Sequence, residues 1–535
     1  MEVSKKKINY LFSNSDLRKL IGPLIVEQLL LIVVGLVDSI MVASVGESAV
    51  SAVSLVDTIM VLVTQVFTAL GTGGAVVAGQ FLGQKNEKKS CEASDQLMLF
   101  LLVSSIGVMI LGYLLKYFIL HKVFGTLEAD VMGFANIYLL IVFLSIPAIA
   151  IYNGAAALFR AMGNSKVTMK ISILMNSVNF VGNAILIYGL KMGVVGAAIP
   201  TVFSRYLAAV IAFYLIKNQD LQIHISEKMC FKFDGSMIKR ILYIGIPNGL
   251  ENSMFQLGKI VVLNLVASFG TASIAANAVS NCLALFQIVP GMAIGQADLA
   301  VVSQCVGADD EYQTRYYTKK MMKLSYIGII ITNVIIFLGL NLILDIYNLS
   351  EGTAQMTREI IIYHGIMAML IWPLSFMIAN TLRASNDVKF CMLVCIFSMW
   401  IFRIGFSYIV GKYMGLGVFG VWVAMTIDWA VRSVFFVWRY LSGKWKLQIL
   451  WNIYNKKTVR FNELQRELGR ITTKTLTDQL RELEEQKIIK RTVYPEVPPK
   501  VEYSFTELGQ TLEPVLKSLC DWGTQYLHRL NAETE

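Results

Sequence analysis

Residues 21–83 decide the fold, because the chain carries a second copy of them. The stretch begins IGPLIVEQLLLIVVGLVDSIMVASVGESAVSAVS, continues LVDTIMVLVTQVFTALGTGG and ends in GQFLG. A later stretch, IGIPNGLENSMFQLGKIVVLNLVASFGTASIAANAVS, matches it without a gap. An ungapped match over roughly 60 positions indicates an internal repeat. Six identical residues recur 224 positions later: Pro23 and Pro247, Glu27 and Glu251, Gly46 and Gly270, Gly71 and Gly295, Gln80 and Gln304, Gly83 and Gly307.

The repeat continues beyond this stretch and gives the chain two similar halves. Near its middle, three residues recur at an offset of 223, and nearer its end three more recur at 224. The first set is Arg160, Ala161 and Lys166 with Arg383, Ala384 and Lys389; the second is Gly193, Val194 and Gly196 with Gly417, Val418 and Gly420. The residues after the second half belong to neither copy.

Long apolar runs dominate both halves. The 535 residues are 55% hydrophobic and 16% charged, with a mean hydropathy of +0.58, which excludes an ordinary soluble enzyme of this length. A helix needs about 20 apolar residues to cross a membrane, and continuous rather than alternating runs exclude a β-barrel. The sequence predicts an all-α polytopic membrane protein with twelve transmembrane helices in two six-helix lobes, near 17–43, 50–80, 93–119, 132–158, 167–189, 194–216, 237–268, 274–304, 318–345, 354–380, 388–411 and 417–440.

Basic residues fall in alternate loops, which predicts the topology. Lysine and arginine gather at 85–89, 160–166, 217–240, 315–320 and 383–389, and the net charge of +10 largely reflects this bias. By the positive-inside rule both termini are cytoplasmic, and we expect a multi-pass protein of the bacterial inner membrane with the lipid bilayer as a partner. No cleavable signal peptide is expected. The predicted parts are an N-terminal tail at 1–16, an N-lobe at 17–216, a cytoplasmic linker at 217–236, a C-lobe at 237–441 and a further domain at 443–530.

Ionisable and amide side chains inside the predicted spans are candidates for function, because a charge in the membrane interior costs roughly 3 kcal/mol or more. Asp38 lies about twenty residues into the first span, and the second copy has Val262 there. Asn176, Asn179 and Asn183 share one helical face of the fifth span, and Thr201 follows Pro200 in the sixth. These groups converging on one carboxylate would hold a proton or a cation. The alternative is that the asparagines only join neighbouring helices.

The second half has its own charged residues, which we take as candidates for a cavity in the C-lobe. Glu251 repeats Glu27, whereas Asp298 and Arg403 have no obvious counterparts. Because buried charges pair, we expect Arg403 to contact Asp298 or Glu251. A structural pair is predicted one helical turn apart, between Asp428 and Arg432.

Nothing in the sequence indicates an enzyme. The four histidines are scattered, the seven cysteines lack metal-ligand spacing, and no nucleophile lies beside a base. The glycines at 71–74 are not followed by the lysine of a phosphate loop and are better explained by close helix packing. No metal site and no cofactor are predicted.

Five motifs in order resemble the multidrug and toxic compound extrusion (MATE) family over residues 15–441. They are GLVDSIMVASVG, GQFLGQ, RAMGNSK, GVVGAAIPT and SQCVGADD. The resemblance implies a secondary active efflux antiporter, with two lobes around a central cavity, that exports organic cations or related compounds in exchange for protons or sodium ions. The family's functional positions match Asp38, the Asn179 to Asn183 motif and Thr201, with a looser match at Asn153. Many members carry aspartate at the position of Asn183, so the coupling ion stays open.

The segment after Leu441 has a soluble pattern. Apolar periodicity predicts three helices, followed by two strands around the bend at 495–499 and a closing helix. This order is typical of a winged helix-turn-helix, whose third helix enters the major groove of DNA. Short polar and basic groups suit phosphates and base edges, and the alternative is a solvated helix face. The candidates are Thr472, Thr473, Lys474, Thr475, Gln479 and Arg481 on the third helix, with Arg491 and Lys500 on the wing.

The same segment resembles the HxlR-type transcriptional regulators over residues 443–525. The motifs are GKWKLQIL, RFNEL, LTDQLRELE and RTVYPEVPPKVEYSFTELG. The usual cysteine ahead of GKW is absent, so thiol sensing is not implied. The resemblance implies a DNA-binding regulatory domain that dimerises. A second hypothesis is a membrane-tethered transcriptional regulator whose transporter-like part senses a ligand.

Overall fold

The computed structural model describes residues 10–123, 128–226, 232–442, 446–469, 471, 473–494 and 500–518. These residues form two units, divided between Phe436 and Val437. The first unit is helical throughout, and the second combines short helices with a small sheet. Each unit has its own buried apolar core.

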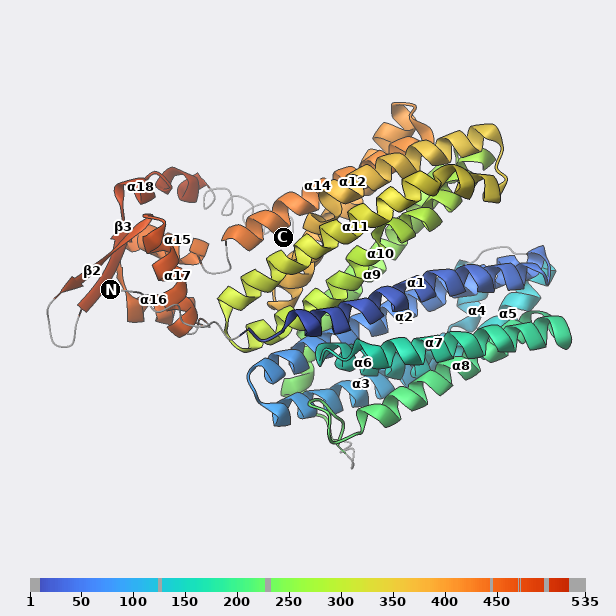
Figure 1. Ribbon diagram of the computed structural model, residues 1–535, viewed down its shortest axis with the longest axis horizontal. Coiled ribbons are helices and arrows are strands. Elements are labelled where there is room, and N and C mark those ends of the chain that lie inside the picture. The colour runs from blue at the N-terminus through green and yellow to red at the C-terminus, as the bar shows by residue number, and fades with distance from the viewer. Residues whose placement is uncertain are drawn as a thin grey trace. The chain divides into compact units, whose positions relative to one another are not determined.

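The helices of the first unit follow the repeat (Figure 1). The first half contains α1 (Asn14–Ala43), α2 (Glu47–Gly83), α3 (Glu87–Leu114), α4 (Lys116–Phe118), η1 (Ile119–Val123), α5 (Ala129–Phe143), α6 (Ile146–Ala161), α7 (Ser165–Asn183), η2 (Ala184–Gly189) and α8 (Gly193–Ile216). The second contains α9 (Gly235–Ala267), α10 (Thr271–Gly307), α11 (Glu311–Tyr347), α12 (Glu351–Ala384), α13 (Val388–Ser398), η3 (Met399–Gly405), η4 (Ser407–Tyr413) and α14 (Gly417–Ser442). The η segments are π-helices.

Equivalent sequence signals start equivalent helices in the two halves. Gly46 and Gly270 precede α2 and α10 with φ angles of 134° and 98°, a conformation that strains any other residue. Asn86 and Asp310 cap α3 and α11, accepting backbone hydrogen bonds at 3.1 and 2.9 Å from the amides three residues later. The repeat therefore fixes the local turns as well as the apolar spans.

Ten helices in the described part of the chain are long and apolar enough to cross a membrane, and the bent pair α5–α6 makes an eleventh. The expected seventh span, α9, is long enough at 33 residues but does not reach this hydropathy, because Lys239, Arg240, Glu251 and Lys259 interrupt it. The count of twelve is thus not confirmed. Large apolar side chains point outward along single helices, as lipid contact requires; on α11 these are Ile331, Ile335, Leu338, Leu342 and Ile346.

The two lobes pack against each other at the end of the bundle where α2 and α10 stop. A methyl group added to Gly73 of α2 would lie 2.7 Å from the Ile241 carbonyl oxygen on α9, so the two backbones touch there. Leu17 and Leu24 of α1 share a buried cluster with Cys305 of α10. We call this region the closed end.

The second unit has the predicted three helices and hairpin. It consists of α15 (Lys446–Lys456), β1 (Thr458–Arg460), α16 (Phe461–Leu468), α17 (Thr473–Glu485), β2 (Ile489–Tyr494), β3 (Lys500–Phe505) and α18 (Glu507–Gln510). The strands form an antiparallel sheet in the order β1-β3-β2, in which Arg491 lies opposite Tyr503. The sequence did not predict β1, which is only three residues long. The fold is a winged helix-turn-helix.

Candidate functional site

Asp38 of α1 lies in a cluster of polar side chains from α7 and α8. Asn183 donates from Nδ2 to Asp38 Oδ1 at 3.0 Å, and the Asn183 Oδ1 atom is buried without a hydrogen-bond partner among the described residues. Gly182 permits the close approach of the helices, because a methyl group there would lie 2.7 Å from Pro200 Cβ on α8. The structure therefore brings Asp38, Asn179, Asn183 and Thr201 together.

The Asn179 amide completes this cluster. Its nitrogen lies 3.0 Å from Asp38 Oδ1 and 3.2 Å from Oδ2 and donates to the carboxylate, while its oxygen accepts from the Thr201 hydroxyl at 3.1 Å. Both asparagines of α7 therefore donate to Asp38.

Sequence reasoning missed a second carboxylate near Asp38. Asp57 of α2 accepts a hydrogen bond from the Tyr138 hydroxyl at 3.2 Å, and both Asp57 and Arg205 are close enough to act on the charge of Asp38. Arg205 donates to the Ser145 hydroxyl at 2.8 Å. A signal for Asp57 is present in the sequence, where LVDSIMV at 36–42 recurs as LVDTIMV at 55–61.

Asn153 lies elsewhere. Its Nδ2 atom donates to Thr68 Oγ1 on α2 at 3.2 Å, and Thr68 lines the cavity between the lobes. Asn153 of α6 therefore bonds to α2, and its role in cation or proton coupling stays a prediction.

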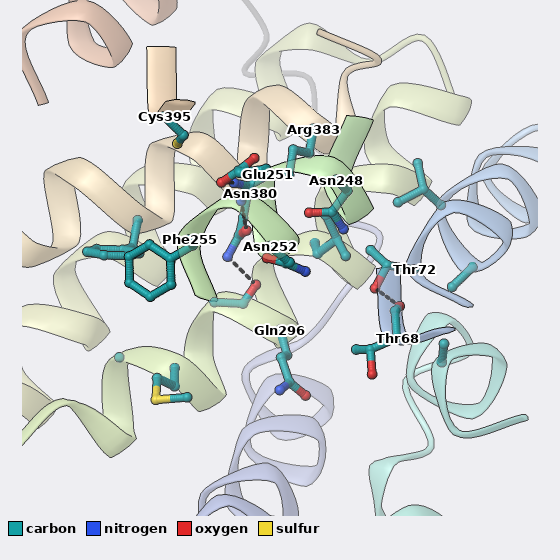
Figure 2. Close-up of a pocket in the computed structure, with 18 of the residues that line it drawn as sticks. Thr68, Thr72, Asn248, Glu251, Asn252, Phe255, Gln296, Asn380, Arg383 and Cys395 are labelled. Carbon is teal, nitrogen blue, oxygen red and sulfur yellow. Dashed lines mark hydrogen bonds and ion pairs between the residues drawn. The ribbon is translucent and has the colours of Figure 1, made fainter. Parts of the chain in front are cut away.

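A cavity of about 380 Å³ lies between the lobes, a size suited to a small organic molecule. Thr68 and Thr72 line it from the N-lobe, and most of the remaining wall comes from the C-lobe. Figure 2 shows Asn252, Phe255 and Gln296 at this wall. Glu251, Asn380 and Arg383 form a further polar group at the same wall.

Two ion pairs repeat between the lobes at this cavity. Arg160 Nη1 lies 3.4 Å from Glu27 Oε1 in the N-lobe, and Arg383 Nη2 lies 2.5 Å from Glu251 Oε1 in the C-lobe. Arg160, Arg383 and Glu251 all line the cavity. The equivalence of the pairs indicates that they belong to the shared architecture of the lobes.

Arg403 does not pair as the sequence predicted. Glu251 is bound to Arg383, and the buried Asp298 accepts a hydrogen bond from Thr381 at 2.9 Å. The nearest carboxylate to Arg403 is Asp428, whose Oδ2 lies 3.9 Å from Nη1. The prediction failed because the other partners of Glu251 and Asp298 are not evident from the sequence.

Asp428 already has a closer partner. Arg432 lies 2.7 Å from its Oδ2 atom, which confirms the predicted pair, and Ser398 donates to its Oδ1 atom at 2.6 Å. Asp428 and Arg432 line the cavity, whereas Asp298 is fully buried and does not. Of the three C-lobe candidates, Glu251 alone contributes to the cavity wall.

In the winged helix, several predicted residues lie at the surface. Thr473, Arg481 and Arg491 are exposed, and Thr475 is half-buried. Thr473 accepts a hydrogen bond from Gln465 at 2.9 Å, which ties the start of α17 to α16. Lys474 belongs to α17, and Thr472 lies outside the described residues.

Two of the predicted DNA-binding residues, Gln479 and Lys500, are partly or fully buried. Gln479 is 3% exposed, so its predicted contact with DNA is wrong; it lies on the same face of α17 as the core residues Leu476 and Leu483. Lys500 is half-buried, 2.8 Å from Glu502, and holds the pKa of that carboxyl below its usual value. Among the described residues no group of three or more histidine, cysteine or acidic side chains is placed to hold a metal ion.

One family model, MatE, matches residues 23–185 and 247–409, more than half of the chain. The chain belongs to the MatE family. The second match begins and ends 224 residues after the first, which confirms the repeat. A second model, the HxlR-like helix-turn-helix, matches residues 440–531. The protein is therefore a multi-pass membrane transporter of a multidrug efflux family with a helix-turn-helix domain of the DNA-binding type, and neither family is enzymatic.

Relatives of both parts are known in bacteria. The "Uncharacterized transporter YisQ" of Bacillus subtilis is 26% identical over 82% of this chain and 96% of its own length. The "Probable multidrug resistance protein NorM" of Thermotoga maritima is 24% identical over 85% and 96%. For the second unit, the "Uncharacterized HTH-type transcriptional regulator BH0655" of Halalkalibacterium halodurans is 49% identical over 16% of this chain and 75% of its own length.

A solved structure shares the fold of the first unit. It is described as an outward-facing conformation of a multidrug resistance MATE family transporter of the MOP superfamily. The TM-score is 0.74 at 18% identity, over 79% of this chain and 94% of the other. At this identity the likeness shows the fold alone.

Proposed function

We propose that the MatE protein is a secondary active efflux antiporter in which Asp38 binds the coupling proton or sodium ion. It exports organic cations or related compounds of drug size through the cavity between the lobes. The observation that carries this proposal is the Asp38 cluster, where amide groups from two positions of α7 converge on one half-buried carboxylate.

The amides of α7 supply a mechanism for ion coupling. When the site is empty, the Asn179 and Asn183 nitrogens donate to the Asp38 carboxylate and compensate its charge. A proton or sodium ion bound to Asp38 takes over this role and weakens these hydrogen bonds. The contacts between α1 and α7 thus differ between the empty and the occupied site, and binding biases the lobes toward one conformation.

The basic loops support a cytoplasmic position for the closed end of the bundle. Lys85, Lys88 and Lys89 follow α2 directly, and the positive-inside rule assigns such loops to the inner side. We therefore infer an outward-facing state, with twelve spans, both termini cytoplasmic and the protein in the bacterial inner membrane. In this topology α9 is the seventh span, and its residues Asn248, Glu251 and Asn252 line the cavity. We keep the boundaries of an N-lobe at 17–216 and a C-lobe at 237–441.

The winged helix supports a second, regulatory function. We propose that residues 443–530 bind DNA through Thr473, Thr475 and Arg481 of α17 and through Arg491 of the wing. Dimerisation through this domain would pair two transporters on one operator. The alternative, a membrane-tethered regulator that only senses ligand, differs from the antiporter in requiring no transport.

Gradient-driven efflux from proteoliposomes tests the antiporter. Ethidium and a zwitterionic rhodamine are loaded, and an inward proton or sodium gradient is imposed on the intact chain, on Asp38→Asn and on a chain truncated after Leu441. We expect efflux by the intact and truncated chains and its loss in Asp38→Asn. Asp130→Asn is the matched control, because Asp130 is exposed in the first turn of α5. Efflux at the intact rate in Asp38→Asn contradicts the mechanism.

A further inference from the structure

We propose that a groove between the starts of α9 and α13 binds an anionic phospholipid. Lys239 and Lys389 hold the phosphate of its headgroup, and its acyl chains lie along α9. Both helices belong to the C-lobe, and the groove shares no lining residue with the cavity between the lobes. Binding of a lipid here goes beyond the proposed function and does not depend on efflux or on the coupling ion.

The groove has a volume of about 470 Å³ and is lined by both helices. Lys239 comes from the second turn of α9, and Lys389 comes from the first turn of α13. Both lysines are exposed. Among the described residues that line the groove these two carry the only charges, and the others are apolar or aromatic. The groove therefore combines a basic end with an apolar wall.

The order of residues along α9 matches the order of the parts of a phospholipid. Lys239 and Ile246 are seven residues apart, which separates them by about 10 Å along the helix axis. Ile246 and Leu250 are 49% and 50% exposed and do not line the cavity, so they suit contact with acyl chains. Tyr243, also exposed, lies between the lysine and these residues, and tyrosine is enriched at the surface of a bilayer. A headgroup at the lysines would leave its chains against apolar side chains.

The charges of the two lysines are not neutralised within the described part of the chain, where no carboxylate oxygen lies within 4.0 Å of either ammonium. Asp234 and Asp387 precede the two helices but do not line the groove. Asp234 instead caps α9 and accepts from its backbone amides at 2.8 and 3.3 Å. The Lys389 ammonium lies 5.4 Å from the centre of the Tyr243 ring, so it is held toward α9. Basic pockets of this kind between membrane helices suit anionic headgroups.

The repeat shows that the shared fold does not require this groove. In the N-lobe, Ser165 at the start of α7 donates from Oγ to the Leu20 carbonyl of α1 at 2.6 Å. The equivalent residue of α13 is Val388, which has no hydroxyl to join its helix to α9 in this way. The N-lobe positions equivalent to Lys239 and Ile246 are Ser15 and Gly22. The lysine above an apolar wall is therefore particular to the C-lobe.

Native mass spectrometry of the full-length protein in detergent tests this lipid site. Dioleoyl phosphatidylglycerol and dioleoyl phosphatidylethanolamine are titrated separately, because they share their acyl chains and phosphate but differ in net charge. We expect the first phosphatidylglycerol to bind about tenfold more tightly than the first phosphatidylethanolamine. The double variant Lys239→Gln, Lys389→Gln should lose this preference. Both side chains are exposed, so the variant should keep the thermal unfolding temperature of the intact chain.

The matched control is the double variant Lys88→Gln, Lys89→Gln. These lysines are exposed in the first turn of α3, and Lys89 also lies over a ring, 5.9 Å from the centre of Phe81, but neither lines the groove. We expect the control to keep the preference for phosphatidylglycerol. Equal binding of the two lipids, or an equal loss of preference in both double variants, would overturn the proposed site. Displacement of phosphatidylglycerol by millimolar inorganic phosphate would also overturn it, because the groove would then bind an anion without its acyl chains.

Discussion

Gln80 and Gln304 make the same contact in opposite directions across the boundary between the lobes. Gln80, near the end of α2, donates from Nε2 to the Ala384 carbonyl of the C-lobe at 3.0 Å. Gln304, at the equivalent place in α10, donates to the Ala161 carbonyl of the N-lobe at 2.6 Å. Arg240 of α9 adds a hydrogen bond of 2.9 Å to Gln80 Oε1. Both glutamine hydrogen bonds must break if the lobes separate at the closed end.

The double variant Gln80→Leu, Gln304→Leu should weaken closure at this end. Each lost hydrogen bond contributes about 1 kcal/mol, so the open population should rise by roughly tenfold or more. Cys305 reports the change, because it is buried between α1 and α10 in the closed state. We expect a maleimide to label Cys305 several-fold faster in the double variant, measured with the other cysteines replaced.

Gln84→Leu is the control for this measurement. Gln84 is exposed at the same end of α2, and its replacement alters local polarity without removing a contact between the lobes. An unchanged labelling rate in the double variant would show that the two glutamines do not hold the lobes together.

Two glycines at the closed end allow α2 and α10 to approach each other closely beside Gln80 and Gln304. A methyl group on Gly83 would overlap the Gln304 carbonyl oxygen, and one on Gly307 would overlap the Gln80 carbonyl oxygen. Gly83→Ala should therefore favour separation of the lobes and speed labelling of Cys305. Gly107→Ala is the control, because a methyl group on Gly107 of α3 would meet no other atom. This substitution should leave the labelling rate unchanged and stabilise the helix by about 0.5–1 kcal/mol. Equal labelling in the two variants would argue against the steric contact.

Much of this fold could be predicted from the sequence because the two halves of the chain are repeats of each other. An apolar span, its glycine turn and its cap recur 224 residues later, so α2 and α10 begin and end at equivalent residues, Glu47 and Thr271, Gly83 and Gly307. Helix α9 shows where hydropathy alone is insufficient. Its residues Asn248, Glu251 and Asn252 face the cavity, so its composition departs from that of a lipid-facing helix.

The site was predictable only where its residues share one regular helix. Asn179 and Asn183 are four residues apart on α7, so their common face was evident from spacing. Asp57 and Asp38 approach through the packing of α1 against α2, which spacing does not give. Arg403 was assigned the wrong partner because Glu251 is bound to Arg383 and Asp298 to Thr381, which the sequence does not reveal.

Asn183→Ala should strengthen binding of the coupling proton. Asn183 donates to Asp38 at 3.0 Å, and a hydrogen bond to a charged group contributes about 1.5–3 kcal/mol. Because this bond stabilises the ionised carboxylate of the empty site, we expect at least tenfold less proton to be required for half-maximal efflux in proteoliposomes. Asn176→Ala is the matched control, since Asn176 lies on the same helix but donates to Ser172 at 3.4 Å. Equal effects of the two substitutions would indicate that the asparagines only join helices.

Arg481→Gln should weaken binding of DNA by the full-length protein. Arg481 is exposed on α17, and a lost phosphate contact should lower affinity by about tenfold and reduce its dependence on salt. The measurement is fluorescence anisotropy on DNA from upstream of the protein's own coding sequence, at several salt concentrations. Lys500→Gln should change affinity less than about twofold, because its ammonium is already 2.8 Å from Glu502. If both substitutions weaken binding equally and leave the salt dependence unchanged, α17 is not the element that enters the groove. If the intact chain binds no DNA under these conditions, the winged helix has another partner.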